Sequence, residues 1–125
     1  MIRNPAGAIL LAATLSAAAL TQVTDASAGG KYDGTWSMVV YTRSGPCDAS
    51  YRFSGQIVNG VISYGSVGVD LTGYVKSSGN AYARVSGGGA YGVAYGRLTA
   101  TRGAGSWRGR TSTGYCSGTW VAMRT

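Results

Sequence analysis

The residue types that usually carry catalysis are scarce in this chain. It contains no histidine, and its four acidic residues are all aspartates. The lack of histidine excludes Ser-His and Cys-His nucleophile systems and removes the commonest metal ligand. Outside the N-terminal stretch, a two-carboxylate hydrolase would have to use two of Asp33, Asp48 and Asp70. Because Asp33 and Asp48 stand beside a turn glycine and a cysteine, where aspartate usually caps or turns the chain, we expect no catalytic residues and no enzyme.

The sequence also predicts no cofactor and no metal site. Gly87-Gly88-Gly89 is the most glycine-rich loop, but it lacks the Lys-Ser/Thr pair and the strand-to-helix context of a phosphate-binding loop. The spacing of the cysteines and aspartates matches no known pattern of metal ligands.

Arginine and aromatic side chains are the groups that remain for binding. Tyr51, Tyr82, Tyr95 and Trp107 alternate along the predicted strands with five arginines: Arg52, Arg84, Arg97, Arg108 and Arg110. Such surfaces suit anionic glycans or single-stranded nucleic acid. We expect anionic polysaccharide or lipid headgroups as partners, and export makes nucleic acid the less favoured one. The alternative is a solvated arginine face over a tyrosine-rich packing layer.

Cys47 and Cys116 are the only two cysteines. In an exported chain an even count predicts a disulfide bond. This bond would close a loop of about 70 residues and stabilise the domain by roughly 4 kcal/mol in the chain-entropy model. The alternative is a pair of free or redox-active thiols, which no Cys-x-x-Cys spacing supports.

The N-terminal stretch, residues 1–28, has the features of a cleaved signal peptide. Arg3 is followed by an apolar run from Ala6 to Leu20, which is short and alanine-rich for a spanning helix, and Ala26-Ser27-Ala28 is a small-x-small cleavage site. We therefore predict a periplasmic or secreted protein whose residues 29–125 form a single domain without a transmembrane segment. An N-terminal membrane anchor is the alternative.

The charge of the predicted mature domain is strongly positive. The whole chain carries +7, and removal of residues 1–28 takes away one base, Arg3, and one acid, Asp25, so the charge stays +7. Such a surface attracts anionic polymers or anionic lipid headgroups. Solubility in the cell envelope explains the same charge equally well.

Short alternating segments between turn residues predict an all-β domain. The 21 glycines make the chain a poor helix former. The expected strands are 36–43, 50–58, 61–64, 67–75, 81–85, 91–99, 105–110 and 115–124. Asn59-Gly60 predicts a two-residue type I′ hairpin between the second and third strands. Further turns are expected at 44–46, 77–80, 87–89, 102–104 and 111–114.

Eight short strands with tight turns predict an antiparallel meander, for which a small closed barrel is favoured over a sandwich or an open sheet. A barrel of this size is expected to have little room beyond its own side chains. In the segment 91–99, one face carries only small residues apart from Leu98, which allows a backbone or a large ring to come close. Intrinsic disorder and an outer-membrane barrel are the alternatives, and the mixed polar and apolar faces favour neither.

Two resemblances arise at the Gly-x-Trp segments. The chain resembles a group of small exported proteobacterial β proteins of unassigned function. The segments that carry this resemblance are Tyr32-Asp33-Gly34-Thr35-Trp36, Cys47-Asp48 with Tyr51-Arg52, Gly96-Arg97-Leu98, Gly103 to Trp107, and Cys116-Ser117-Gly118-Thr119-Trp120 with Arg124. This resemblance implies no activity.

The Gly-x-Trp of the first strand and the arginine of the last strand are similar to the closing signature of calycins, which include lipocalins, avidins and certain bacterial metalloprotease inhibitors. The resemblance implies that the tryptophan packs across the barrel end under the basic residue. In this sequence the barrel-closing residues would be Gly34, Trp36 and Arg124, with Trp120 in the second Gly-Thr-Trp.

Three classes of function follow from these patterns. The first is a non-enzymatic exported barrel that binds an anionic envelope or extracellular polymer. The second is a small-ligand-binding or protease-inhibitor-like barrel, which requires an interior cavity or an N-terminal arm that residues 29–33 barely provide. The third is a structural envelope protein without a ligand.

Overall fold

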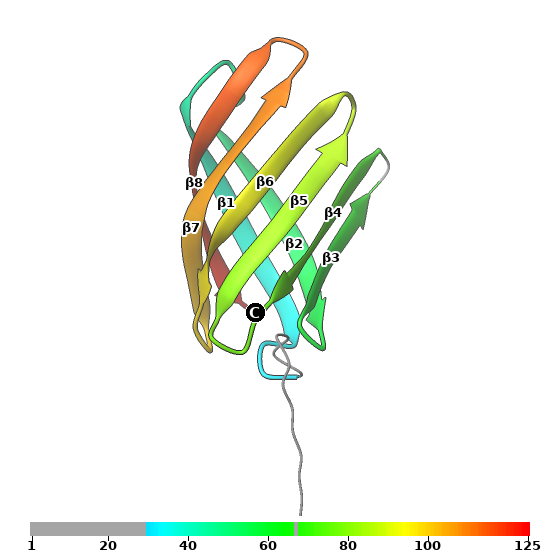
Figure 1. Cartoon of the computed structure of the whole chain (residues 1–125), viewed down its shortest axis with the longest axis vertical. Coiled ribbons are helices and arrows are strands. Elements are labelled where there is room, and N and C mark those ends of the chain that lie inside the picture. The colour runs from blue at the N-terminus through cyan, green and yellow to red at the C-terminus, as the bar shows by residue number, and fades with distance from the viewer. Residues whose placement is uncertain (1–29, 67) are drawn as a thin grey trace, which may run out of the picture.

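Eight strands that follow one another along the chain close into an antiparallel β-barrel (Figure 1). The computed structural model describes residues 30–66 and 68–125. Each strand pairs with the next, and β1 also pairs with β8, which closes the sheet. This confirms the predicted meander and the closed barrel. The strands are β1 (Gly34–Ser44), β2 (Ser50–Val58), β3 (Val61–Ser66), β4 (Val69–Val75), β5 (Asn80–Gly87), β6 (Ala90–Leu98), β7 (Arg102–Thr111) and β8 (Gly114–Arg124).

The predicted signal peptide, residues 1–28, lies outside the described residues, as do Gly29 and Val67. The expected start of the fourth strand at Val67 therefore cannot be compared, and β4 begins at Val69. Within residues 30–66 and 68–125, no helix has the length and apolar character needed to cross a membrane.

The hairpin between β2 and β3 turns at Asn59-Gly60, as the sequence predicts. Both residues have left-handed backbone angles, with φ 51° at Asn59 and 79° at Gly60. These angles define the two central positions of a type I′ turn, and Val58 pairs with Val61 directly beside it.

The prediction of a turn at residues 102–104 is wrong, because Arg102 already begins β7. The chain reverses one step earlier, where the Thr99 N–H donates to the Arg102 carbonyl at 2.7 Å and the Arg102 N–H donates to Thr99 Oγ1 at 3.2 Å. Gly103 serves packing instead: a Cβ on it would meet the Leu98 side chain and lie 3.3 Å from the Trp120 ring. Glycine at position 103 makes room for the side chains of Leu98 and Trp120. The glycine that suggests a turn in the sequence therefore has a packing role in the structure.

The three tryptophans of the Gly-x-Trp segments all project into the barrel, and each stands opposite a glycine of a neighbouring strand. On β7 and β8 the arrangement is reciprocal, since each tryptophan faces the glycine of the other strand's Gly-x-Trp. A missing side chain thus leaves room for a ring. The three pairs are Trp36 with Gly55, Trp107 with Gly118, and Trp120 with Gly105.

The core lies at one end of the barrel, the lower end in Figure 1, where the C-terminus is marked. Because the tryptophans of β1 and β8 are large and their neighbours are small, the two rings fill this end. We call it the closed end. Its buried cluster consists of Tyr32, Trp36, Ile57, Val75, Ala81, Leu98, Trp120 and Ala122.

Candidate functional site

Arg124 covers Trp36 at the closed end. The two residues are partners across β1 and β8, and the guanidinium carbon lies 5.7 Å from the centre of the Trp36 ring. The guanidinium donates to the Ala100 carbonyl at 2.9 Å and to the Asp33 carbonyl. Trp36 Nε1 donates to the Tyr32 carbonyl at 2.8 Å. Charge-assisted bonds to backbone carbonyls and the cation–π contact hold the start of β1 against the end of β8.

An apolar cavity of about 360 Å³ occupies the rest of the barrel interior. Its formation follows from residue size. The inward residues of β5 and β6 are mostly alanine and glycine, so this side of the barrel contributes little bulk. Larger side chains come from the other strands, with Leu71 and Trp107 on the adjacent strands β4 and β7, and Phe53 and Tyr64 on β2 and β3. The expectation of little interior room was therefore wrong: the small face that admits the Trp120 ring at Gly96 leaves space along the rest of its length.

The wall of this cavity offers little polar chemistry. Among the described residues no polar or charged side chain is fully buried. The indole N–H groups are already occupied: Trp107 Nε1 donates to the Tyr41 carbonyl at 2.9 Å, and Trp120 Nε1 donates to the carbonyls of Tyr95 and Ser106. A guest inside the barrel would meet aliphatic and aromatic carbon, which favours an apolar molecule.

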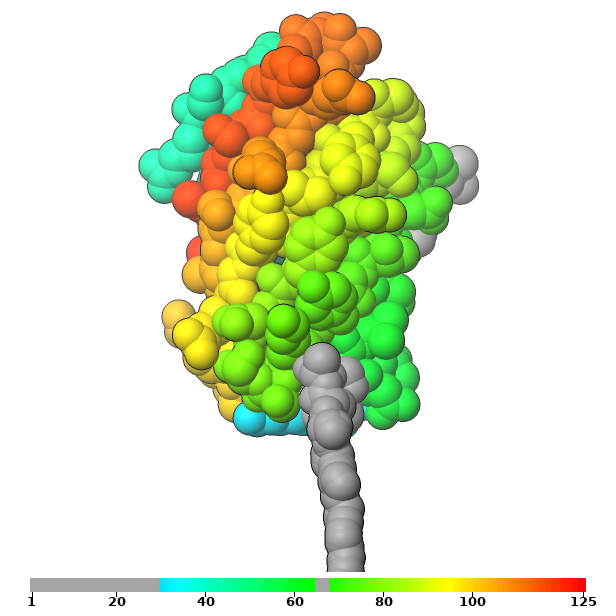
Figure 2. Space-filling model, viewed as in Figure 1, coloured from blue at the N-terminus to red at the C-terminus, as the bar shows by residue number. Residues whose placement is uncertain are grey.

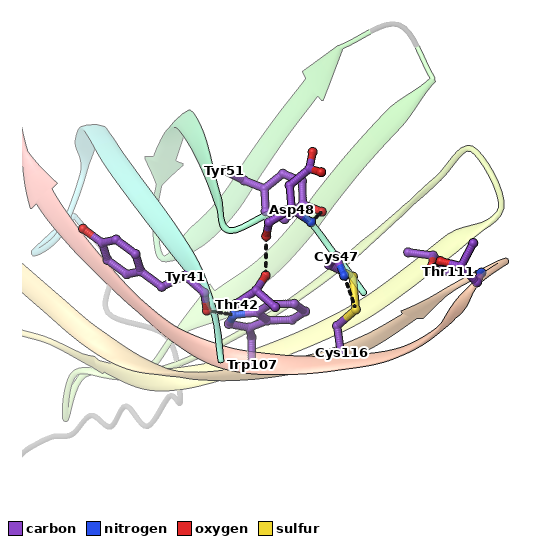
Figure 3. Close-up of a disulfide and its surroundings, with 9 residues drawn as sticks. Tyr41, Thr42, Cys47, Asp48, Tyr51, Trp107, Thr111 and Cys116 are labelled. Carbon is purple, nitrogen blue, oxygen red and sulfur yellow. Dashed lines mark hydrogen bonds between the residues drawn. A yellow bond between two sulfur atoms is a disulfide. The ribbon is translucent and has the colours of Figure 1, made fainter. Parts of the chain in front are cut away.

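The mouth of the cavity lies at the end opposite Trp36, where Cys47, Gly87, Arg110 and Thr111 contribute to its lining. A disulfide bond between Cys47 and Cys116 ties the loop after β1 to β8 at this mouth (Figure 3). Figure 3 shows Trp107 on the inner side of the same region.

The loop at the mouth is also held by hydrogen bonds. Thr42 Oγ1 donates to the Asp48 carbonyl at 2.6 Å, and the Asp48 N–H donates to the Tyr51 hydroxyl at 3.1 Å. The Thr42 N–H donates to the Ala49 carbonyl at 3.0 Å. The disulfide bond and these hydrogen bonds together hold the loop at the mouth.

A second candidate surface lies on the outside of the barrel. Arg84 on β5 and Arg108 on β7 stand in one cross-strand row, separated by Val93 on β6. The Arg108 guanidinium carbon lies 5.6 Å from the centre of the Tyr95 ring. Arg110, two residues further along β7, lies between Tyr91 and Tyr115 of the neighbouring strands. We call this surface the arginine–tyrosine face.

The structure brings together most, but not all, of the arginines that the sequence singled out. Arg84, Arg97, Arg108 and Arg110 lie on the consecutive strands β5, β6 and β7. Arg52 lies on β2, opposite Val39 of β1, and is separated from the others by several strands. The anion-binding role of all five arginines stays a prediction.

The other predicted residues have definite positions. The Cys47–Cys116 disulfide is confirmed. Trp36 and Trp120 are both 5% exposed at the closed end. Gly34 has φ 134°, which only glycine adopts readily, and a Cβ at this position would lie 3.6 Å from Nε of Arg124. The closing role of Gly34, Trp36, Trp120 and Arg124 stays a prediction that this geometry allows.

The three aspartates do not converge on one site. Asp33 lies at the closed end, where its carboxylate accepts from the Asn59 N–H at 2.8 Å. Asp48 belongs to the loop at the mouth, and Asp70 is paired with Ser86 in the wall. Within residues 30–66 and 68–125, no three residues among His, Cys, Asp and Glu are grouped as metal ligands would be.

Sequence reasoning missed two features of these sites. Tyr32 is 3% exposed and belongs to the core cluster, although it precedes the first strand. Tyr74 forms part of the outer wall next to Tyr82. The signal for Tyr74 was its alternation with the inward Gly73 and Val75, whereas the position of Tyr32 depends on the turn that begins at Gly30.

Comparisons of the chain with models of known protein families, with curated proteins and with solved structures found no match.

Proposed function

We propose that this domain is a non-enzymatic binding protein that holds a small apolar molecule inside its barrel. The observation that carries the proposal is the apolar cavity of about 360 Å³, which lies near the lower end of the range of about 300–1,000 Å³ for ligand pockets. The molecule would enter at the mouth beside the Cys47–Cys116 disulfide, because the opposite end is filled by Trp36 and Trp120.

The physical chemistry of the cavity supports this ligand class. Water in such a space would find few hydrogen-bond partners, so an apolar cavity binds water poorly and apolar molecules well. Removing apolar surface of the ligand from water contributes about 25 cal/mol per Å². The closed end would set the depth of binding, and any polar group of the ligand would lie at the mouth.

The experiment is a fluorescence titration with N-phenyl-1-naphthylamine, a neutral dye that brightens in apolar surroundings. We expect the wild-type domain to bind it and the variant Ala83→Leu to bind it at least about tenfold more weakly, a loss of 1.4 kcal/mol. Ala83 lines the cavity between the small residues Gly73 and Ala94, so a leucine there would occupy the space of the dye.

Ala104→Leu is the matched control, because Ala104 is an exposed residue on the outer face of β7. The control should bind the dye like the wild type. Both variants should keep the far-ultraviolet spectrum of the barrel, since filling a cavity often stabilises a protein. Equal dye binding by all three proteins, or none by the wild type, would contradict the proposal.

A second candidate function is binding of an anionic envelope or extracellular polymer on the arginine–tyrosine face. The observation in its favour is the position of Arg84, Arg97, Arg108 and Arg110 on adjacent strands of a protein with a net charge of +7. Acidic polysaccharide and anionic lipid headgroups share the charge that this surface would attract. The disulfide is typical of an oxidising, extracytoplasmic compartment, and we propose the periplasm or the extracellular space.

This candidate predicts that the double variant Arg84→Gln/Arg108→Gln binds polygalacturonate about tenfold more weakly at low salt. Arg43→Gln/Arg102→Gln removes the same charge from exposed positions outside the face and should have a much smaller effect. Affinity electrophoresis over a series of salt concentrations measures both. Equal losses in the two double variants would indicate attraction by net charge alone, and binding of neither dye nor polymer would favour a structural envelope protein without a ligand.

A further inference from the structure

We propose that three outward tyrosines form a stacking platform for the sugar rings of an acidic polysaccharide, whose carboxylates are bound by arginines on both sides. The residues are Tyr74 on β4, Tyr82 on β5 and Tyr95 on β6, which we call the tyrosine row. The inference rests on the proposed binding of an anionic polymer. It adds the class of polymer and the surface that recognises it.

The three rings lie next to one another along a line that crosses the strands. Tyr74 is the cross-strand partner of Tyr82, and Tyr82 is the partner of Tyr95. The ring centres are 5.6 Å and 6.0 Å apart, and the ring planes are inclined by 34° and 44°. This wall of the barrel faces the viewer in Figure 2, which shows the outer surface of β4, β5 and β6. The spacing matches the scale of a single sugar ring.

The tyrosine row continues into two exposed valines. Val61 on β3 is paired with Tyr74, and Val58 on β2 is paired with Val61. The exposed fractions are 58% for Val58, 54% for Val61 and 46% for Tyr74. Cross-strand aromatic pairs stabilise a sheet by about 0.2–1 kcal/mol, which gives the tyrosines a structural role. That role does not explain why the apolar row extends over β2 and β3, where the side chains stay open to solvent.

Cations flank the tyrosine row along both edges. Arg84 lies two residues beyond Tyr82 on β5, and Arg108 lies against Tyr95. On the other edge, Arg97 lies two residues beyond Tyr95 on β6. Two residues along a strand span about 7 Å, so the charged rows run close beside the rings. A polymer laid across the strands would meet rings beneath it and positive charge at its sides.

An acidic polysaccharide fits these features better than other anions. The flat C–H faces of sugar rings pack on the negative face of an aromatic ring, and a tyrosine hydroxyl can hydrogen-bond to sugar hydroxyls. Polyphosphate and lipid headgroups offer the charge without stacking rings. Single-stranded nucleic acid offers both, but the Cys47–Cys116 disulfide is typical of compartments outside the cytoplasm.

The test compares polygalacturonate, polyphosphate and an oligothymidylate as probes of the same protein. We expect Tyr82→Ala to weaken polygalacturonate binding at least about fivefold, in line with the loss of one stacked ring, and to leave polyphosphate binding unchanged. Tyr82→Phe should keep most of the affinity because it keeps the ring. Tyr41→Ala is the control, since Tyr41 is 43% exposed on β1, outside both the tyrosine row and the arginine–tyrosine face.

The outcomes separate this inference from the function on which it rests. If Arg84→Gln/Arg108→Gln loses polygalacturonate binding while Tyr82→Ala, Tyr74→Ala and Tyr95→Ala do not, the stacking platform is wrong and anionic-polymer binding stands. Tighter binding of oligothymidylate than of polygalacturonate would overturn the choice of polymer. If the folded wild type binds none of the three probes at low salt, both proposals fail.

Discussion

Replacing Gly105 by valine should destabilise the barrel by about 3 kcal/mol or more, the upper end of the usual cost of overpacking. A Cβ at this position would lie 2.8 Å from Cε2 of Trp120 and 2.6 Å from the Cα of Gly96, and it would press on the Tyr95 carbonyl. Relief would require β6 and β7 to separate where Gly96 and Gly105 are paired. Urea unfolding followed by circular dichroism measures the loss.

Ala104→Val is the matched control for this variant. It adds a similar side chain one residue away, on the exposed outer face of β7, where surface substitutions usually change stability by less than about 0.5 kcal/mol. Valine also favours extended backbone, which makes the control neutral or slightly stabilising. If Gly105→Val is as stable as Ala104→Val, the packing of Trp120 against glycine does not limit the fold.

Removing the Cys47–Cys116 disulfide should cost about 4 kcal/mol, from the entropy of a loop of this length in the unfolded chain. The two cysteines are 69 residues apart in sequence, so the bond restrains most of the domain in its unfolded state. For a domain of about 100 residues, this loss corresponds to a fall of roughly 20 °C in Tm. Thermal unfolding of the double variant Cys47→Ala/Cys116→Ala, compared with the oxidised wild type, measures the effect.

Reduction of the wild type provides the control that leaves the side chains in place. The reduced wild type and the double variant should unfold at similar temperatures, and dithiothreitol should not affect the variant. A reduced protein with nearly unchanged Tm would mean that the sheet closes β1 onto β8 without help from the bond. Dye binding at the reduced mouth would then also be unchanged, because Asp48 keeps its hydrogen bonds with Thr42 and Tyr51.

Much of the architecture could be predicted because its causes are local. Asn59-Gly60 accepts left-handed backbone angles wherever it occurs, so the hairpin there needed no knowledge of the rest of the chain. Side chains alternate along a strand, so Trp36, Met38 and Val40 share one face of β1, and all three line the barrel interior. The predicted turn at residues 102–104 was wrong because glycine occurs both in turns and at sites of close packing. At position 103 it makes room for Leu98 and Trp120 and does not turn the chain.

The cavity and the grouping of the arginines could not be predicted, because both depend on which residues of different strands lie close together in the folded barrel. The alternation on β5 and β6 showed a face of alanine and glycine, but it did not reveal whether a ring would fill the space. In the folded barrel Trp120 fills it at Gly96, and the length beside Ala83 and Ala94 stays open as the cavity. In the sequence Arg52 lies close to an aromatic residue, like the other arginines, but the strand order places it on β2, away from β5, β6 and β7.

The sequence by itself determined the fold class of this protein: an all-β meander of eight strands, held by one disulfide. These properties follow from backbone preference, alternation and composition, which act over a few residues. The tertiary structure alone decided the register. That register sets each tryptophan opposite a glycine, lines up Tyr74, Tyr82 and Tyr95, and leaves the cavity open. The physical reason is that closure fixes how neighbouring strands are shifted against one another, and cross-strand contacts depend on that shift.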